Sequence, residues 1–211
     1  MPVALTVDIV GSRRIPDRDA AQRALDDAIA RVADDLPVAE TPLHPIVGDE
    51  LQGVYPTLDA ALATTLLLQL ALPDVVECRF GLGVGAMGLV PSASGDIPDG
   101  PGWWAARAAI DRVHALQQRA VPSARTWVAA DASEPTGAHT AVRSANAYLL
   151  ARDELVGAMS ERARRLTYGR CFGVTQRSLA EQEGITQSAV SQLLTAAGAA
   201  SVVEGYRLLE P

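Results

Sequence analysis

The sequence predicts an α+β protein in two parts: a ferredoxin-like β-α-β-β-α-β domain over residues 1–138, followed by an all-α helix-turn-helix domain over residues 139–211. Strand and helix patterns alternate through the first part, with a Gly-Asp hairpin in the middle. Only helical patterns follow the polar linker at 131–138. The order is that of a split βαβ sheet. We expect helices on one face of this sheet and an opposite face left free for a ligand.

The elements expected in the first part are, in chain order, a strand at 2–12, a helix at 17–36, two strands within 43–56, a helix at 57–72, a strand at 75–90, a loop at 91–102, a helix at 103–120 and a strand at 125–130. Apolar residues recur at helical spacing in the first helix. The Gly48-Asp49 pair suits the tip of the hairpin. Thr57 is the expected cap of the second helix, which ends before Pro73.

Three glycines lie on alternate positions of the strand expected at 75–90. They are Gly81, Gly83 and Gly85. Glycine weakens a strand unless another segment packs close to the backbone. We therefore expect a close neighbour at this strand.

Residues 175–194 have the pattern of a DNA-binding helix-turn-helix. Gly184 suits the left-handed residue of the tight turn, and Thr186 can cap the second helix. The residues expected to face inward are Leu179, Ala180, Ile185, Val190, Leu193 and Leu194. The residues expected to reach base edges are Thr186, Gln187, Ser188, Ser191, Gln192 and Thr195. An ordinary helical hairpin with a polar outer face is the alternative.

Positive charge gathers just before this motif. Residues 162–177 hold five arginines and no acid, namely Arg162, Arg164, Arg165, Arg170 and Arg177. Residues 151–211 are neutral overall, with seven arginines and seven acids, whereas residues 1–150 have a net charge of −7. The cluster predicts phosphate contacts to double-stranded DNA. A solvated helix face would give the same local pattern.

The composition is that of a folded domain with an apolar core, since 48% of the 211 residues are hydrophobic. The longest apolar run is broken by polar residues, and no signal peptide is evident, so we expect a cytoplasmic protein that does not contact a membrane. Cys78 and Cys171 are isolated and are expected to be reduced. All eighteen basic residues are arginine, which excludes lysine-dependent chemistry.

Several catalytic classes lack their motifs in this chain. The three histidines have no metal-ligand spacing, and no Gly-x-Ser-x-Gly, Cys-His or Walker-type motif is present. These absences argue against an acyl-transfer enzyme and a P-loop NTPase.

Asp8 and Asp49 are the candidate metal ligands. Asp8 lies in an otherwise apolar strand, where a carboxylate is costly to bury unless it is paired or metal-bound. Two aspartates on adjacent strand ends are how a palm-type fold holds Mg²⁺ or Mn²⁺ for nucleotide phosphates. Two structural alternatives stay open: Asp8 as the cap of a turn toward Ser12 and Arg13, and Asp49 as part of the hairpin alone.

Four motifs together resemble the SatD family of bacterial proteins over nearly the whole chain: VDIVGSRR, GDELQGVYP, FGLGVGAMG and GPGWWAARAAI. The last fifty or so residues, from MSERARRLTYGR onward, resemble region 4 of sigma factors and related tri-helical regulators. The first resemblance implies architecture more than activity, and the second implies DNA binding.

The same four motifs resemble, more distantly, the catalytic domain of class III nucleotide cyclases, which has a palm-like fold. That resemblance implies Asp8 and Asp49 as metal carboxylates and Arg107 as the residue that stabilises charge on the phosphates. It also implies that the backbone of Ile9, Val10, Gly11 and Ser12 approaches the phosphate, and that subunits pair head to tail.

Two departures from the cyclase pattern bear on catalysis. Trp103 stands where the cyclases have the asparagine that orients the ribose, and the purine-selecting lysine cannot exist in a lysine-free chain. Trp103 and Trp104 would instead form an aromatic platform for a base, or serve as core or homodimer anchors.

Two hypotheses follow. The first is a DNA-binding transcriptional regulator, active as a homodimer, whose cyclase-like domain senses a nucleotide or related small molecule. The second is a Mg-dependent nucleotide cyclase or other enzyme acting on nucleotide phosphates, with an attached DNA-binding domain. The sequence favours the first, because the helix-turn-helix pattern is complete and the catalytic set lacks two members.

Overall fold

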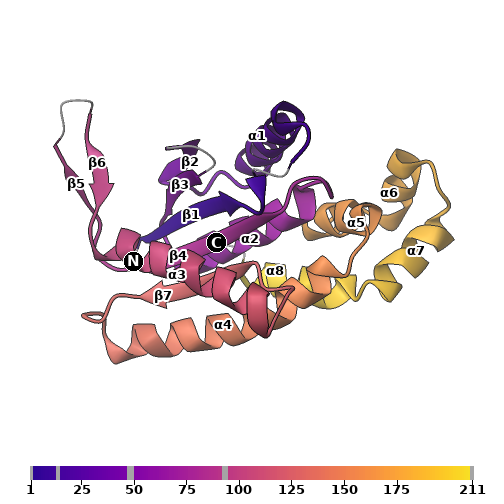
Figure 1. The fold of residues 1–211 in the computed structure, drawn as a ribbon. Helices are drawn as coiled ribbons and strands as arrows, with labels where there is room; N and C mark the ends of the chain where they lie inside the picture. Colours follow the sequence, from indigo (N-terminus) through magenta and orange to yellow (C-terminus); the bar gives the residue numbers. More distant parts are fainter. Residues whose placement is uncertain (1, 13–14, 47–49, 92–94, 210–211) are drawn as a thin grey trace.

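A five-stranded sheet lies at the centre of the molecule, with helices on both faces (Figure 1). The computed structural model describes residues 2–12, 15–46, 50–91 and 95–209. The strands of this sheet are β1 (Val3–Ile9), β2 (Thr41–Pro45), β3 (Glu50–Tyr55), β4 (Cys78–Val84) and β7 (Thr126–Ala130). A separate two-stranded sheet contains β5 (Gly88–Val90) and β6 (Ile97–Asp99). The helices are α1 (Arg18–Asp35), α2 (Leu58–Ala71), α3 (Pro101–Arg119), α4 (Thr136–Gly157), α5 (Glu161–Cys171), α6 (Gln176–Glu183), α7 (Gln187–Ala196) and α8 (Ala199–Leu209).

The strand order in the central sheet is β2-β3-β1-β4-β7. β1 pairs antiparallel with β3 and β4, β2 pairs antiparallel with β3, and β7 lies parallel to β4. The first four strands have the split βαβ order, with α1 joining β1 to β2 and α2 joining β3 to β4. The predicted α+β class and sheet pattern are confirmed. The predicted hairpin tip at Gly48-Asp49 lies outside the described residues.

Helices α1 and α2 lie on one face of the sheet. The side chains of Val3, Leu5 and Val7 alternate toward this face and are buried in its core. α2 is buried on nearly all sides because it lies between the sheet and helices α5 and α8. Thr57 caps α2 as predicted, accepting a hydrogen bond from the Ala60 N–H at 3.1 Å.

Helix α3 covers the opposite face over β1, β4 and β7, so the prediction that this face is free is wrong there. The reason lies in the glycines of β4. A Cβ at Gly81 or Gly83 would overlap backbone atoms of Ala106 or Gly102 in α3. Only glycine allows the helix to approach the strand this closely, which confirms the expected close neighbour.

Helix α4 lies along the outer edge of β7. The Asn146 side chain accepts a hydrogen bond from the Val128 N–H at 2.8 Å and donates to the Val128 carbonyl at 2.9 Å. Further along α4, Asp153 accepts from the backbone N–H groups of Arg125 and Thr126, both at 2.7 Å. These side chains satisfy backbone groups that an edge strand would otherwise expose.

The prediction of one strand over residues 75–90 is wrong about its length, because this segment contains β4 and β5. The chain leaves the central sheet after β4, where the Ala86 carbonyl accepts a hydrogen bond from the Gly102 N–H at 2.9 Å. β5 and β6 then form a two-stranded arm that projects from the body (Figure 1), partly within the segment predicted as a loop. A strand pattern shows no change of pairing partner, so β4 and β5 look continuous in the sequence. Among the described residues of the arm, Leu89, Val90 and Ile97 are large, apolar and exposed.

Helices α6 and α7 meet at Gly184 as predicted. Gly184 has a φ of 64°, in the left-handed region that favours glycine. Thr186 caps α7 by accepting a hydrogen bond from the Ala189 N–H at 3.2 Å. Four residues predicted to face inward are buried: Leu179, Ala180, Val190 and Leu194.

The buried residues of the sheet, of α2 and of the C-terminal helices form one continuous apolar cluster. The division of the chain between residues 138 and 139 stays a prediction. Among the described residues, no helix combines the length and the apolar character that crossing a bilayer requires.

Candidate functional site

Asp8 lies near the end of β1, on the face of the sheet that α3 covers. In the strand register it is directly opposite Glu50 of β3 and Arg79 of β4. Directly opposed residues place their side chains on the same face of a sheet. Three charged side chains from three neighbouring strands therefore meet at this end of the sheet.

Two ion pairs organise these side chains. Arg79 donates from Nη1 to Asp8 Oδ2 at 2.8 Å and from Nε to Gln117 Oε1 of α3 at 2.5 Å. Arg107 of α3 forms an ion pair with Glu50. We call Asp8, Arg79, Glu50 and Arg107 the carboxylate–arginine quartet.

The two pairs of the quartet differ in exposure. The side chains of Asp8 and Arg79 are 29% and 12% exposed, whereas Arg107 is 54% exposed. The arginines offset the repulsion between two carboxylates on adjacent strands. Glu50 is 20% exposed, so Arg107 is the member of its pair that solvent reaches most easily.

The metal site predicted on Asp8 and Asp49 stays a prediction. Asp49 lies outside the described residues. Asp8 is bound to Arg79, and the described residues contain no group of three His, Cys, Asp or Glu side chains that could hold a metal ion. The described side chains therefore do not by themselves fit Mg²⁺ or Mn²⁺, and the metal stays a prediction.

The segment predicted to approach a phosphate, residues 9–12, directly follows Asp8. The backbone N–H of Val10 donates to the Glu77 carbonyl at 2.8 Å and is therefore already used. Gly11 has a φ of 64° and turns the chain away from the sheet. The alternative in which Asp8 caps a turn toward Ser12 and Arg13 stays open, because Arg13 lies outside the described residues. The described side-chain partner of Asp8 is Arg79.

Trp103 and Trp104 lie in the first turn of α3, and Trp103 precedes Arg107 by about one helical turn. Trp103 is half-buried. Trp104 is 61% exposed and donates from Nε1 to Asp99 of β6 at 2.9 Å. Their predicted roles, as a platform for a base or as homodimer anchors, stay predictions.

Sequence reasoning missed Glu50 and Arg79. Both had a signal in the sequence. Glu50 directly follows Asp49 in the GDE motif. Arg79 lies two residues before Gly81, so it is on the same face of the strand as the glycines that contact α3. Pairing of Arg79 with Asp8 could not be predicted, because it depends on which strands are neighbours.

The two cysteines are free and buried. Burial, with the nearby negative charge of Asp8, raises the pKa of the Cys78 thiol to about 12. Burial also raises the pKa of Cys171 to about 12. Both thiols are therefore protonated near neutral pH and are not suited to nucleophilic chemistry.

The predicted base-reading face of α7 is open to solvent. Its exposed residues are Thr186, Gln187, Ser188, Ser191, Gln192 and Thr195. None of these side chains is apolar, and α7 buries its opposite side against the other C-terminal helices. The geometry therefore leaves this face free for a partner.

Four of the five arginines in the predicted phosphate-contacting cluster have acidic partners within the chain, whereas Arg170 donates to the Val174 carbonyl at 2.5 Å. Glu183 accepts two hydrogen bonds from Arg165, both at 2.8 Å, and lies 3.3 Å from Arg162. The hydrogen bonds from Arg165, together with the positive charges of Arg165 and Arg162, lower the pKa of Glu183. Arg177 pairs with Glu181 at 3.3 Å.

The Arg164 side chain makes its contacts within the protein instead of extending into solvent. Its Nη2 donates to Asp74 at 2.6 Å and to the Leu72 carbonyl at 3.1 Å, at the C-terminal end of α2. The side chain is only 12% exposed. Positive charge near α7 is thus more compensated than the sequence pattern indicates.

The fold and the site together define an α+β protein with the carboxylate–arginine quartet at one end of its central sheet. Within this class the chain belongs to the SatD family, whose model matches residues 2–203. The family resemblance of the four motifs is confirmed. Among curated proteins no sequence matches the chain.

Several solved structures similar to this chain are nucleotide cyclases. A bacterial light-regulated adenylyl cyclase is 14% identical, with 60% of this chain and 74% of that chain covered and a TM-score of 0.44. The guanylyl cyclase Cya2 is 16% identical over 53% of this chain and 70% of that chain, with a TM-score of 0.40. The adenylyl cyclase CyaB from P. aeruginosa is 12% identical over 56% of this chain and 81% of that chain, with a TM-score of 0.36. The resemblance of the last fifty residues to sigma-factor region 4 stays a prediction.

Proposed function

We propose that this protein binds the phosphate group of a nucleotide at the carboxylate–arginine quartet. The observation that carries the proposal is the half-exposed pairing of Arg107 with Glu50. A guanidinium binds carboxylate and phosphate oxygens in the same forked geometry, so a phosphate takes the place of the Glu50 carboxylate. The cyclase-like motifs around Asp8 and Arg107 support a nucleotide as the source of that phosphate.

Arg79 has a different part in the proposal. It is largely buried and holds Asp8 and Gln117 at the same time. Arg79 therefore keeps Asp8 neutralised while Arg107 exchanges partners. Of the two hypotheses from the sequence, a protein acting on nucleotide phosphates fits this arrangement more directly than a DNA-binding regulator.

Arg107→Ala is expected to weaken nucleotide binding by about 10- to 100-fold, because hydrogen bonds to charged groups contribute about 1.5–3 kcal/mol. The measurement is isothermal titration calorimetry with ATP and GTP, each with and without Mg²⁺ or Mn²⁺. Arg119→Ala, an exposed arginine in the last turn of the same helix, is the matched control and should bind as the parent does. Equal affinity in Arg107→Ala and the parent protein would refute the assignment.

Turnover is a separate question, which the same ligands answer. A metal-dependent product from ATP or GTP, detected by chromatography and lost in both Asp8→Asn and Arg107→Ala, would identify an enzyme. Binding without product would identify a sensor. In either case the Arg107→Ala titration decides whether the quartet is the nucleotide site.

Double-stranded DNA is a second candidate ligand, favoured by the exposed polar face of α7. Gln187→Ala or Gln192→Ala should relax sequence preference, since each base contact contributes about 1–3 kcal/mol to discrimination. Gel-shift titration with fragments upstream of the protein's own gene measures this, with exposed Gln182→Ala in α6 as the control. Failure to retain any fragment at low salt would remove this candidate. A homodimer that reads two half-sites remains part of this proposal.

A further inference from the structure

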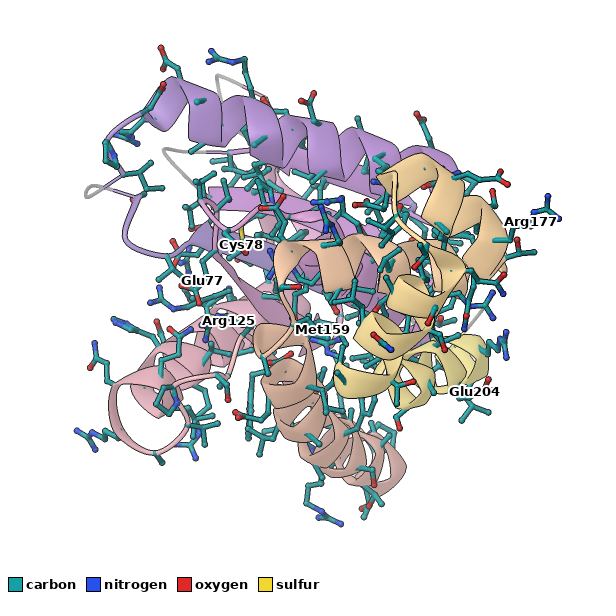
Figure 2. The ribbon with its side chains drawn as sticks, turned by 90° about the vertical axis from the view of Figure 1, so that its right-hand side faces the viewer. Glu77, Cys78, Arg125, Met159, Arg177 and Glu204 are labelled. Carbon is teal, nitrogen blue, oxygen red and sulfur yellow. The ribbon has the colours of Figure 1, made fainter. Side chains whose placement is uncertain are left out.

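A cavity of about 340 Å³ lies where the end of α2, the start of β4 and β7, and helices α4 and α5 meet. We call it the junction cavity. It is lined by charged residues from the sheet side and from the C-terminal helices. In Figure 2, Glu77 and Arg125 lie close together on the sheet side, and Met159 lies between α4 and α5. The junction cavity is outside the quartet, since none of the four quartet residues lines it.

Arg125 is the first of two arginines in the lining. Its Nη1 donates to the carbonyls of Pro122 and Ala124, at 2.7 and 2.8 Å, and its Nη2 forms an ion pair with Glu77. Partial burial lowers the pKa of Arg125, in part offset by the negative charge of Asp153. Backbone carbonyls thus hold this guanidinium in place whatever anion it faces.

Arg164 is the second arginine. Besides Asp74 and the Leu72 carbonyl, it donates from Nη1 to the Met159 carbonyl at 3.1 Å. Its Nε is buried and has no hydrogen-bond partner among the described residues. A buried donor of this kind costs free energy unless an acceptor reaches it, so the lining has an unused N–H.

The acids that pair with these arginines are replaceable. Glu77 is 44% exposed and Asp74 is 68% exposed, so water can solvate each carboxylate when its arginine takes another partner. Asp153, the third carboxylate of the lining, is different: it is fully buried and is neutralised by Arg152 at 2.8 Å. Asp153 also accepts hydrogen bonds from the backbone N–H groups of Arg125 and Thr126. Its negative charge is therefore largely compensated and repels an anion only weakly.

Apart from these charged residues and Gln69, whose amide donates to Asp153 at 3.1 Å, most of the lining is apolar. It includes Leu72, Val76, Phe80 and Val156. A ligand that fills the cavity must therefore carry an apolar portion beside its charged group.

We propose that the junction cavity binds a small amphiphilic anion, whose carboxylate or phosphate group replaces Glu77 and Asp74 as the partner of Arg125 and Arg164. The apolar portion of the anion packs against Phe80 and Val156. Because the lining comes from α2, β4, Arg125 just before β7, α4 and α5, such a ligand contacts the sheet and the C-terminal helices together. Occupancy therefore stabilises the packing of these helices on the sheet.

The test is calorimetric titration of the full chain with benzoate, phenyl phosphate, inorganic phosphate and benzyl alcohol. Saturable binding of benzoate or phenyl phosphate is expected, and benzyl alcohol, which lacks the charge, should bind at least about tenfold more weakly. Comparison of benzoate with phenyl phosphate identifies the preferred oxyanion. Inorganic phosphate, which lacks the apolar portion, should bind more weakly than phenyl phosphate.

Two variants move the affinity in opposite directions. Glu77→Gln removes a competing carboxylate and should tighten binding by about threefold, while Arg125→Gln should weaken it about tenfold. Glu154→Gln, an exposed carboxylate on α4, is the matched control and should leave the affinity unchanged. Since Glu77 is half exposed, its variant folds even if Arg125→Gln does not.

Arg107→Ala separates this site from the quartet. Binding of phenyl phosphate should survive in Arg107→Ala, whatever becomes of nucleotide binding there. Loss of binding in Arg107→Ala, unchanged affinity in Glu77→Gln, or equal binding of benzyl alcohol and phenyl phosphate would each overturn the proposal.

Discussion

Asp153→Ala is expected to lower the free energy of unfolding by about 3–5 kcal/mol, the cost of removing one partner from a buried ion pair. Asp153 and Arg152 are fully buried, with side-chain exposures of 0% and 1%. The change leaves the Arg152 guanidinium without its counterion. It also leaves the backbone N–H groups of Arg125 and Thr126 without their acceptor.

Urea denaturation followed by circular dichroism measures this loss. Glu154→Ala changes the neighbouring, exposed carboxylate and should alter the free energy of unfolding by no more than about 0.5 kcal/mol. A loss below about 1 kcal/mol in Asp153→Ala would mean that Arg152 finds another partner or water, and the buried network would not have the structural role assigned to it.

Gly83→Ala is expected to lower the free energy of unfolding by about 1–3 kcal/mol or more, because a methyl group at this position overpacks the core. The added Cβ would overlap backbone atoms of Gly102 and Ala106, and backbone cannot rotate away as a side chain can. The helix would have to move off the sheet. Thermal unfolding monitored by circular dichroism reports the change.

The matched control is Gly137→Ala in α4. A Cβ at Gly137 would meet nothing within 4 Å, and alanine has the higher helix propensity by about 1 kcal/mol. This variant should be neutral or slightly stabilised. Similar melting temperatures for the two variants would contradict the close packing of α3 on β4.

Local signals predicted most elements of the fold. Thr57 and Thr186 cap helices where expected, and Gly184 has the left-handed conformation of the turn. These features depend on hydrogen bonds and backbone angles within a few residues, so the sequence contains them directly. The split sheet order was predicted in a different way, from the succession of strands and helices along the chain.

Interactions between distant segments were not predictable in this way. Arg164 was expected to contact DNA phosphates, yet it binds Asp74, which is 90 residues away in the chain. Asp8, whose metal role stays a prediction, pairs with Arg79, which is 71 residues away. In both cases a charged residue has several physically acceptable partners, and only the tertiary structure decides among them.

The two outer strands of the central sheet have a consequence for assembly. β7 is covered by Asn146 and Asp153 of α4, and β2 contains Pro42 and Pro45, which have no N–H to offer, together with an irregular register against β3. Neither border is suited to β-augmentation, in which another chain adds a strand to the sheet. Association through the borders of the central sheet is therefore disfavoured, and this sheet is protected from the edge-to-edge growth that leads to aggregation.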